Sequence, residues 1–482
     1  MEPEVRHHEI YDLLCEIVGS DYVADDDFAK LTYSCDAGIY PGISPGIIVR
    51  PKSSEEVADI IKLANRTGTP VIPRGGGASL FGFPRGEPGR SIVIDLTRMD
   101  EVINIDEKNR IVTVEAGTTC SKLATIVKRK GYHLPTVWFT YYYATIGGLL
   151  AGVVGGGGDK DFASIGATGD IVNGFKVVLP NGDIIQTGSG PGTNTNQITT
   201  FTRNCPGPDL TGLFINSCGM FGVITEATLQ LFPIPRINEP GSFLFDNVDS
   251  SWQAIYSLMH RYPIPYSSLI GISPEGVKII TGEEIDKWAF LYAVRGDSSE
   301  EVSAKHKMIE TICKDAGGTS GSEITDRVAQ GAVVTAEVMR ETPSKAYLKG
   351  AVATHEFIAP AGDLLQLYKT MDAEIKKRYT DDFEKYHLMR RDYLAPWGRG
   401  VIFGAINIYY DAADLEAVKR VAVISREVNT LYVKLGAFLD LPQGYASQIT
   451  AFYFSPTYFN FLRTLKSIID PNNIMCPGIY NL

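Results

Sequence analysis

The stretch PRGGGASLFG, residues 73–82, follows a short apolar segment and decides how this chain is interpreted. Three consecutive glycines allow a tight backbone turn and present bare N–H groups, which suit a pyrophosphate, and Arg74 adds charge beside them. A Walker loop would end in Gly-Lys-Ser/Thr, and a dinucleotide-binding GxGxxG loop would carry glycine where Leu80 stands. Neither pattern is present, and the loop taken alone is equally compatible with a structural turn.

The segments around this loop alternate between expected strands and helices. Ser53 and Glu56 have the spacing of a capping box, and apolar residues then recur on one helical face until Gly68. The Asn181-Gly182 pair predicts a hairpin between two further strands. The expected strands in this half of the chain are GIIVRP (46–51), PVIP (70–73), SIVIDL (91–96), RIVTVEAG (110–117), FKVVLP (175–180) and DIIQTG (183–188).

Composition excludes several classes of protein. The 482 residues are 44% hydrophobic and 21% charged, which is typical of a soluble globular chain of two or three domains. The formal charge of −11 repels a phosphate backbone, so no nucleic-acid partner is expected. The first residues carry acids where a signal peptide needs basic residues, so a cytoplasmic location is expected. Membrane association through a partner subunit stays open.

The seven cysteines contain no CxxC pair and no local cluster. Spacing of this kind predicts neither a zinc site nor an iron–sulfur cluster, so the cysteines are not expected to relay electrons. Cys218 and Cys476 are interpreted as small buried fillers, with contact to a cofactor as the alternative.

Beyond the glycine loop, several segments together resemble one known family. YSCDAGIYPGISPGIIVRPKSSEEVADIIKLANRTGTPVIPRGGGAS (33–79) resembles the N-terminal half of the FAD domain in the vanillyl-alcohol oxidase / para-cresol methylhydroxylase superfamily. TIGG (145–148), IGATGDIVNGFKVVLPNG (165–182) and PDLTGLFINSCGMFGVITEATLQL (208–231) follow in the order of that family, and DPNNIMCPG (470–478) is similar to its closing motif. The resemblance covers roughly residues 33–235 and 457–478, and ordered motifs over that span predict FAD where a single loop would not.

The resemblance implies an α+β fold: a two-subdomain FAD-binding domain of the para-cresol methylhydroxylase type plus an α+β cap domain. It implies an FAD-binding domain over 1–235, a cap or substrate domain over 236–440, and a C-terminal segment over 441–482 that returns to the FAD domain. The residues implied for FAD are Pro73, Arg74, Gly75, Gly76, Gly77, Ala78, Ser79, Gly82, Pro135, Thr136, Thr145, Ile146, Gly147, Gly148, Gly152, Gly166, Thr168, Asp170, Gly219, Gly222, Val223, Ile224 and Asn473.

Two departures from the family pattern narrow the chemistry. Some members attach FAD covalently through a histidine where this chain has Ala78, so FAD is expected to be non-covalent, although attachment in the cap through Tyr393 or His387 stays open. Members that oxidise D-2-hydroxy acids carry metal-binding histidines on a cap strand. Here Ala405 stands at the first of those positions, and neither 400–411 nor 435–445 contains histidine, so no metal is expected.

Aromatic and basic residues remain as candidates near the expected substrate pocket. Paired tyrosines and an arginine stabilise a phenolate in phenol-oxidising members, and an arginine also clamps a carboxylate. His387 is the candidate base because the neighbouring arginines favour its neutral form, whereas His355 is interpreted as a structural histidine. For any single tyrosine, packing at a domain interface is the favoured interpretation. The candidate catalytic residues are His387, Arg390, Arg391, Tyr393, Tyr142 and Tyr445.

The function expected from these features is an FAD-dependent oxidoreductase that transfers hydride from a small alcohol, phenol or hydroxy acid to flavin N5, without a metal. The aromatic, metal-free pocket favours a phenolic substrate over a D-2-hydroxy acid of the lactate or glycolate type. An FAD subunit that only transfers electrons within a larger complex is the alternative from another class, and an NADPH-dependent reductase of the UDP-sugar type is a third. An oligomer or a complex with a partner subunit is expected, and the electron acceptor is left open between oxygen, a quinone, a cytochrome and an electron-transfer protein.

Overall fold

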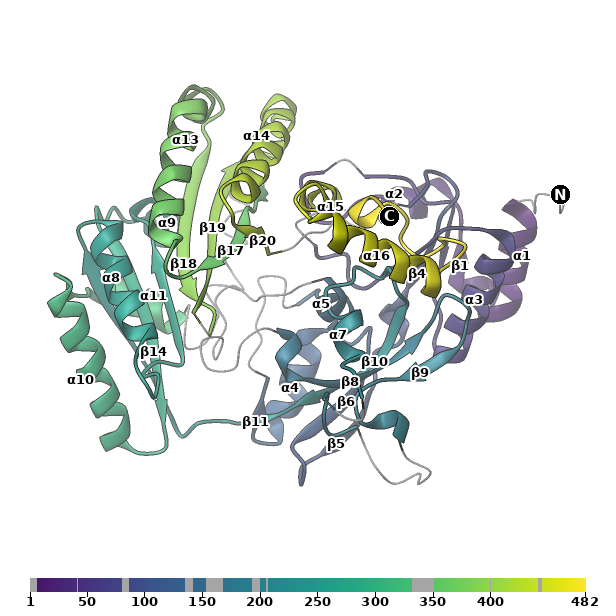
Figure 1. The fold of residues 1–482 in the computed structure, drawn as a ribbon, viewed down its shortest axis with the longest axis horizontal. Coiled ribbons are helices and arrows are strands. Elements are labelled where there is room, and N and C mark those ends of the chain that lie inside the picture. The colour runs from purple at the N-terminus through teal and green to yellow at the C-terminus, as the bar shows by residue number, and fades with distance from the viewer. Residues whose placement is uncertain are drawn as a thin grey trace.

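The computed structural model describes residues 7–40, 42–79, 86–134, 142–152, 168–192, 200–204, 207–331, 351–398, 400–440 and 444–482. They form two lobes that lie side by side (Figure 1). One lobe contains the first half of the chain together with the C-terminus, and the other contains the segment between them. The described residues include no helix with the length and apolar character needed to cross a membrane.

The first sheet of the N-terminal lobe carries the glycine loop. In the described part of the chain it has four strands in the order β1-β2-β4-β3, and β2, β4 and β3 run parallel. The helix α3 (Ser54–Thr67) makes the crossover between β2 and β3, capped by Ser53, which accepts from the Glu56 amide, and ended by left-handed Gly68. These features confirm the helix expected from the capping box. The strands and remaining helices are β1 (Val23–Ala24), β2 (Ile47–Val49), β3 (Val71–Arg74), β4 (Ile92–Asp95), α1 (His7–Val18) and α2 (Asp27–Tyr33).

A second sheet in this lobe is antiparallel. Its described strands have the order β5-β6-β10-β8-β9. The expected hairpin joins β8 and β9 through a loop in which Gly182 has a φ of 85°, the left-handed conformation that glycine adopts without strain. The elements are β5 (Val102–Asp106), β6 (Ile111–Glu115), α4 (Cys120–Arg129), α5 (Ile146–Gly152), β8 (Val172–Val178), β9 (Ile184–Gln186), α7 (Thr211–Phe214) and β10 (Val223–Gln230), and a separate pair is β7 (Tyr132–His133) with β11 (Phe232–Pro233).

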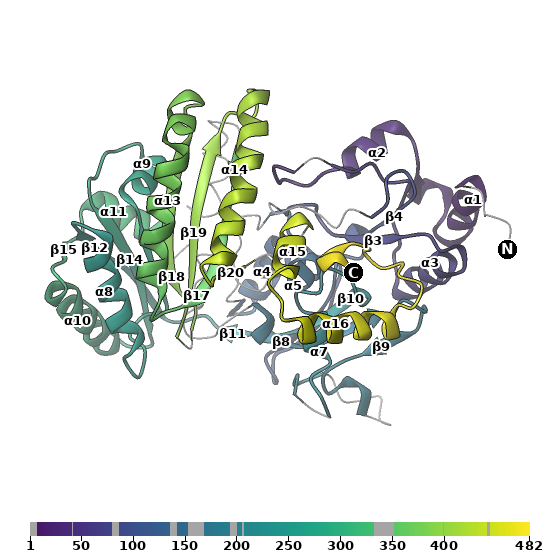
Figure 2. The ribbon, with the colours of Figure 1, turned by 45° about the horizontal axis from the view of Figure 1, so that its top comes forward.

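The C-terminal segment packs on this N-terminal lobe. Helices α15 (Gly444–Ala451) and α16 (Pro456–Ile469) lie beside it in both views of Figures 1 and 2. The tail then runs along β3: the Val71 amide donates to the Ile474 carbonyl at 2.7 Å, and the Cys476 amide donates to the Val71 carbonyl at 3.0 Å. Residues from both ends of the chain therefore share one apolar core.

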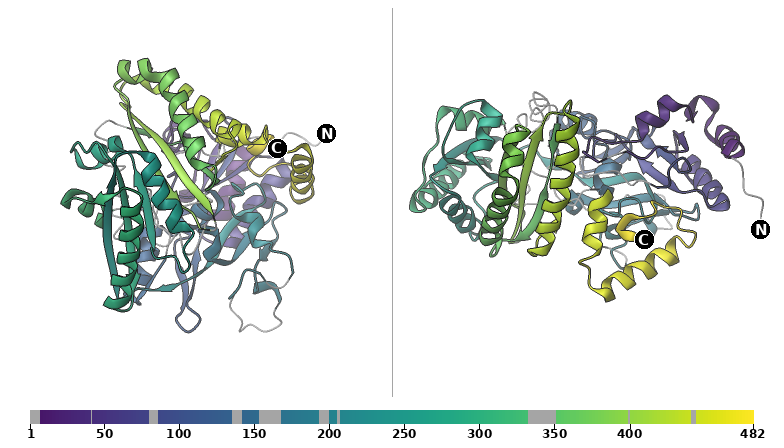
Figure 3. Two further views of the ribbon diagram at one scale, coloured as in Figure 1. Left: turned by 60° about the vertical axis from the view of Figure 1, so that its left-hand side comes forward. Right: turned by 90° about the horizontal axis from the view of Figure 1, so that it is seen from above.

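The other lobe is built on one large antiparallel sheet, covered by helices (Figure 3). Its described strands have the order β15-β12-β14-β13-β18-β19-β17-β20, with β16 also paired to β19. The strands are β12 (Ile237–Phe245), β13 (Ser268–Ile272), β14 (Trp288–Gly296), β15 (Thr319–Ser320), β16 (Ala351–Ala353), β17 (Glu356–Pro360), β18 (Met389–Pro396), β19 (Val401–Tyr410) and β20 (Phe438–Leu439). The helices are α8 (Val248–Met259), α9 (Pro274–Thr281), α10 (Ser299–Asp315), α11 (Glu323–Ala329), α13 (Leu364–Lys385) and α14 (Leu415–Lys434).

Alternation along the central strands of this sheet separates two faces. Leu394, Ile402 and Ile406 belong to an apolar cluster that also includes residues of α13 and α14. Tyr393 and Ala405, one position away, belong instead to the cluster that contains the core of the N-terminal lobe. We call this second face, with the side chains of Arg391, Tyr393, Ala395, Phe403, Ala405, Asn407, Tyr409, Glu356 and Ile358, the inner face of the large sheet.

Candidate active site

The glycine loop lies directly against the segment that precedes α5. A Cβ added to Gly75 would lie 2.0 Å from Thr145 Oγ1, and one added to Gly76 would lie 1.8 Å from the Tyr143 carbonyl oxygen. Distances this short admit no side chain, and both contacts involve atoms of a fixed backbone turn or a buried residue. The two segments that the sequence separates by about 70 residues therefore meet through their backbones.

The TIGG segment forms the start of α5 and is tied to the end of β6. The Ile146 amide donates to the Thr118 carbonyl at 2.9 Å, and the Gly147 amide donates to the Ala116 carbonyl at 2.8 Å. Thr145 Oγ1 accepts from the Gly148 amide at 3.3 Å, which caps the helix. These contacts hold the helix start beside the glycine loop.

The loop before β10 and the C-terminal tail, which the family resemblance also implies for FAD, lie next to β3, the strand that leads into the glycine loop. Gly219, with a φ of 80°, is so close to its neighbours that an added Cβ would lie 3.1 Å from Cys476 Sγ and 3.3 Å from Pro73 Cγ. Asn473, with a φ of 48°, precedes the residue whose carbonyl bonds to β3. Gly222, Val223 and Ile224 stand where β10 begins, next to Gly219 in the chain.

The donor set of this region fits a nucleotide cofactor. Glycine backbone N–H groups at close-packed turns bind phosphate, and buried hydroxyl groups bind sugar or ring atoms. Thr168, at the start of a short 3₁₀ helix (Thr168–Ile171), is buried, and within the described residues its Oγ1 has no hydrogen-bond partner. Such an atom is stabilised when a ligand supplies the partner.

The other implied cofactor residues are distributed as follows. Arg74 donates to the Cys35 carbonyl at 3.0 Å and its guanidinium lies 5.0 Å from the centre of the Tyr33 ring. Gly77 has a φ of 64°, and Ala78 and Ser79 complete the described part of the loop. Asp170 is exposed and Gly152 is buried. Gly82, Pro135, Thr136 and Gly166 lie outside the described residues.

The inner face of the large sheet carries a buried polar cluster. The Arg391 guanidinium lies 5.5 Å from the centre of the Tyr393 ring and 5.7 Å from that of Tyr409. Tyr393 donates its hydroxyl to Glu356 Oε1 at 2.9 Å. Arg391 and Asn407 are paired across β18 and β19, and within the described residues neither side-chain atom of Asn407 has a hydrogen-bond partner. All five residues are buried, so their charges and dipoles act in a medium of low dielectric constant.

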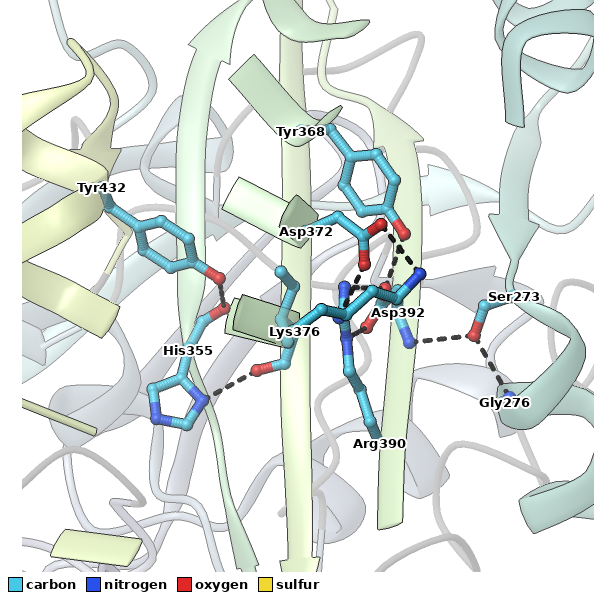
Figure 4. A network of polar contacts seen from close by, with 10 residues as sticks. Ser273, Gly276, His355, Tyr368, Asp372, Lys376, Arg390, Asp392 and Tyr432 are labelled. Carbon is cyan, nitrogen blue, oxygen red and sulfur yellow. Dashed lines mark hydrogen bonds and ion pairs between the residues drawn. The ribbon is translucent and has the colours of Figure 1, made fainter. Parts of the chain in front are cut away.

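Two of the expected catalytic residues belong to this cluster, and Arg390 does not. Arg390 points to the opposite face of the sheet, where it donates to Asp372 at 2.8 Å and to Asp392 at 2.7 Å (Figure 4). Tyr368 of α13 also donates to Asp392, at 2.6 Å. This network joins β18 to α13. The structure thus separates Arg390 from Arg391 because neighbouring residues of a strand point to opposite faces.

The structure does not bring the remaining expected residues into the cluster. His387 is exposed in the turn between α13 and β18, with a φ of 50°. Tyr142 is 56% exposed in the segment that precedes α5. Tyr445 belongs to α15, and its side chain lies outside the described part.

His355 has the structural role expected of it. Its Nδ1 lies 2.7 Å from the Ile406 carbonyl oxygen and its Nε2 lies 2.9 Å from Ser425 Oγ, so both ring nitrogens have partners. Burial lowers the pKa of this imidazole to about 4, and the contact with Ile406 opposes that shift. The ring is therefore neutral at physiological pH and links the segment just before β17 to β19 and α14.

Glu356 was missed by the sequence analysis. It stands next to His355 in the chain and is the partner of Ala405 in the register of β17 and β19. Burial raises the pKa of its carboxyl to about 7, against the opposing effects of the Tyr393 hydroxyl and the Arg391 charge. The alternation His-Glu-Phe-Ile in a strand was the available signal, because it places Glu356 and His355 on opposite faces. Among the described residues, no group of three or more histidine, cysteine, aspartate or glutamate side chains is arranged to hold a metal.

Comparison with known proteins agrees with this architecture. Residues 45–188 match the model of the FAD binding domain, and residues 241–480 match that of the C-terminal domain of FAD linked oxidases. The chain belongs to this family of FAD-linked oxidases, and it is an FAD-dependent oxidoreductase. The expected family, fold class and cofactor are confirmed.

Individual relatives align with this chain from end to end. The glycolate oxidase subunit GlcD of Bacillus subtilis (strain 168) is 25% identical over 98% of this chain and 96% of its own length. D-lactate dehydrogenase of Anaerostipes hadrus is 24% identical over the same shares. Among solved structures, p-cresol methylhydroxylase with substrate bound superimposes with a TM-score of 0.81 at 18% identity, over 100% of this chain and 98% of its own. The 4-ethylphenol oxidase of Gulosibacter chungangensis gives 0.82 at 18% identity, over 98% and 96%.

Proposed function

We propose that this protein oxidises a small organic anion at a carbon that carries or acquires oxygen, with FAD as the hydride acceptor. The observation that carries the proposal is Arg391. It is a buried arginine between the rings of Tyr393 and Tyr409, on the face of the large sheet whose apolar residues continue the core of the FAD-binding lobe. A buried guanidinium is the group that holds a carboxylate or a phenolate in a fixed orientation.

The residues around Arg391 complete a small polar site. Asn407 offers one acceptor and two donors in the row of Arg391, and Tyr393 offers a hydroxyl in the next row. Ala405 stands in the row of Tyr393 and has a small side chain. In a buried site, these groups position a substrate without reorganising, and exclusion of water strengthens each contact.

We infer that the bound FAD is held by the meeting point of the glycine loop, the start of α5, the loop before β10 and the C-terminal tail. FAD supplies a two-electron acceptor for hydride when it is bound there. Ala78 is compatible with non-covalent binding, and the FAD-binding domain would then comprise 1–235 with 441–482, leaving 236–440 as the cap. The separate sheets of the two lobes and the packing of the C-terminal tail on β3 support this division.

Hydroxy acids are the first substrate candidates. Both relatives that align from end to end are named for glycolate or D-lactate chemistry, and Arg391 suits the carboxylate of such a substrate. Phenols are the second candidate, because the two tyrosine rings that flank Arg391 suit an aromatic anion. The absence of histidine at Ala405 distinguishes this site in either case from the metal-binding pattern expected of D-2-hydroxy-acid oxidising members.

Anaerobic bleaching of the flavin tests the proposal. The purified holoprotein is mixed without oxygen with glycolate, D-lactate, L-lactate, 4-methylphenol or 4-ethylphenol, and the flavin absorbance is followed. At least one acid or phenol is expected to bleach it, and addition of a chelator separates a metal-dependent reaction from a metal-free one. Arg391→Gln is expected to raise KM about 10- to 10²-fold, because a charged hydrogen bond contributes about 1.5–3 kcal/mol.

A flavin that dithionite reduces but no member of the panel reduces would contradict the proposal. That result would favour the alternative of an electron-transferring subunit in a larger complex, for which the name of the Bacillus relative as an oxidase subunit is the supporting observation. Pull-down of the native protein from its source then identifies the partner, and reoxidation by oxygen or by a quinone identifies the acceptor.

A further inference from the structure

Glu356, Tyr393 and Ala405 form one row across three neighbouring strands of the inner face. Ala405 of β19 is the register partner of Glu356 on β17 and of Tyr393 on β18. The outer two strands are separated by two interstrand spacings, roughly 10 Å, a span that only long side chains can bridge. Ala405, at the centre of the row, has only a methyl side chain. The Tyr393 side chain passes over it and donates its hydroxyl to Glu356 Oε1 at 2.9 Å.

The second oxygen of this carboxyl is buried. Within the described residues, Glu356 Oε2 has no hydrogen-bond partner. Burying a carboxylate oxygen without a partner costs free energy, and a glutamine would fill the same space without a charge. Unlike a glutamine, a glutamate in this position can exchange a proton.

The groups around Glu356 keep the pKa of its carboxyl near neutral pH. Burial raises the pKa of the carboxyl to about 7, and the Tyr393 hydroxyl and the Arg391 charge on β18 limit the rise. Asp440, at the end of β20, is also buried close by, and its amide donates to the Glu356 carbonyl at 3.2 Å. Tyr432 of α14 lies on the opposite face and donates to the His355 carbonyl at 3.2 Å. A carboxyl in this environment accepts and releases protons near neutral pH, as a general base must.

We propose that Glu356 is the proton acceptor of the oxidation and that Tyr393 conveys the proton to it from the substrate hydroxyl. The inference rests on the proposed function. As the substrate C–H bond breaks, the hydride leaves to the bound FAD and the carbon–oxygen double bond forms. The substrate O–H proton passes to Tyr393 Oη while the Tyr393 proton passes to Glu356 Oε1. The substrate thus loses two electrons and one proton as the hydride, and its second proton ends on the Glu356 carboxyl.

This assignment moves the role of base from His387 to Glu356. His387 is exposed in a turn beyond the end of β18, whereas Glu356 shares a face of the sheet with Arg391. A general base must lie within hydrogen-bond reach of the proton that it accepts, directly or through one intervening group. With Arg391 holding the anionic end of a substrate, a hydroxyl one or two bonds away falls beside Tyr393, two residues along the same strand.

Stopped-flow reduction of the holoenzyme between pH 5 and 9 tests the role, with the substrate found by flavin bleaching. The limiting rate of the wild-type enzyme is expected to rise with pH through one ionisation near 7, because only the carboxylate accepts a proton. Glu356→Gln is expected to lower this rate about 10²–10⁴-fold, to remove the ionisation and to leave the substrate dissociation constant within threefold. Tyr393→Phe is expected to lower the rate while the Glu356 ionisation persists.

Glu239→Gln, on the outer cap strand β12, is the control, and it is expected to keep both the rate and the pH profile. A second readout needs no turnover: an infrared titration of the holoprotein is expected to show a protonated carboxyl band that disappears near pH 7 and is missing in Glu356→Gln. An enzyme reduced normally by substrate when Glu356 is glutamine, or one with no such band, overturns the role of Glu356 alone. A wild-type flavin that no substrate reduces overturns the proposed function and the role with it.

Discussion

Single glycines determine how closely the segments of the FAD-binding lobe approach one another. Gly76 leaves 1.8 Å between the position of an added Cβ and the Tyr143 carbonyl oxygen, so any side chain there must move a backbone segment. Glycine has a hydrogen atom in place of Cβ, and this allows the two loops to lie in contact. The glycine-rich composition of this region thus reflects contact between backbones as much as the freedom of the turn itself.

Gly76→Ala is expected to reduce FAD occupancy about tenfold or more, because displacement of the loop removes backbone hydrogen bonds worth about 1 kcal/mol each. The ratio of flavin to protein absorbance after purification measures the effect. Gly362→Ala is the matched control, since an added Cβ there meets no atom within 4 Å. Full occupancy in Gly76→Ala would show that the loop does not contribute to the FAD site.

Near the C-terminus, the buried ion pair of Lys466 and Asp470 holds separate segments together. Lys466 donates to Asp470 at 2.5 Å and to the carbonyls of Met220 and Met475 at 3.1 and 2.7 Å. Asp470 also accepts from the amides of Ile474 and Met475. Two buried charges thus connect α16, the loop before β10 and the tail.

Asp470→Asn is expected to lower the free energy of unfolding by about 3–5 kcal/mol, because it leaves the Lys466 charge buried without its counterion. Denaturant unfolding followed by flavin fluorescence measures the change. The exposed pair of Glu416 and Lys419 provides the comparison: both side chains are 72% exposed, and Glu416→Gln is expected to cost less than about 1 kcal/mol. Equal effects of the two substitutions would contradict a structural role for the buried pair.

At the scale of elements, helix α13 extends beyond the apolar pattern of its sequence because it contacts neighbouring elements. Its apolar periodicity weakens after Tyr379, yet the helix continues to Lys385. The extension is stabilised by Asp382, which accepts from two nitrogens of Arg420 on α14 at 2.8 and 2.7 Å. The Arg390 network anchors the same helix to β18, so α13 is held along its length by polar contacts in addition to its apolar stripe (Figure 4).

His355 connects elements in a way that depends on pH. Its pKa in the folded protein is about 4, below the value of about 6.5 in an unfolded chain, so the unfolded state binds the proton more tightly. Stability that is present above pH 6.5 is therefore lost as the pH falls towards 4, by about 2 kcal/mol between pH 7.5 and pH 5. The difference in melting temperature between these two pH values is expected to shrink in His355→Gln.

His8→Gln is the control for that measurement, because His8 is exposed on α1. It is expected to keep the full difference between the two pH values. If His355→Gln and the wild-type protein lose the same number of degrees on acidification, other buried groups are responsible for the acid sensitivity.

At the scale of the whole molecule, the C-terminal tail completes the lobe that the N-terminal half begins. Ile474, Met475 and Cys476 are buried in the same core as β3. The tail follows the large sheet in the chain, so the polypeptide leaves the FAD-binding lobe, forms the second lobe and returns (Figures 1 and 3). The core of the FAD-binding lobe is therefore completed only by residues that follow the second lobe in the chain.

Truncation after Asp470 is expected to give a protein that is insoluble or free of FAD. Removing the buried tail residues costs on the order of 5 kcal/mol or more, which is comparable with the whole stability of a domain. Soluble yield and flavin content measure the effect, with Ile468→Ser as the control, because Ile468 is 71% exposed on α16. A soluble truncated protein with its full complement of FAD would contradict the proposed return of the tail to the FAD domain.

Local sequence was sufficient for much of the fold. The N-cap at Ser53, the left-handed stop at Gly68 and the hairpin glycine Gly182 specify backbone conformations by short-range sterics and hydrogen bonds. Ordered motifs over residues 33–235 and 457–478 identified the FAD-binding superfamily, because a cofactor of fixed shape requires glycine at fixed turns. The sequence also predicted a cap segment separate from the FAD-binding segment, and that division stays a prediction.

Only the tertiary structure showed which residues of the large sheet lie on its inner face, where we propose that the substrate binds. Arg390 and Arg391 are adjacent and chemically identical, yet one joins the network on α13 and the other lies between two tyrosine rings on the inner face. Burial raises the pKa of the Glu356 carboxyl, and Tyr393 and Arg391 on another strand oppose that shift, which no local pattern encodes. The sequence determined the family and the cofactor through local backbone chemistry. The pairing of the strands decided which side chains lie on the inner face of the large sheet, since register and burial arise only when the sheet assembles.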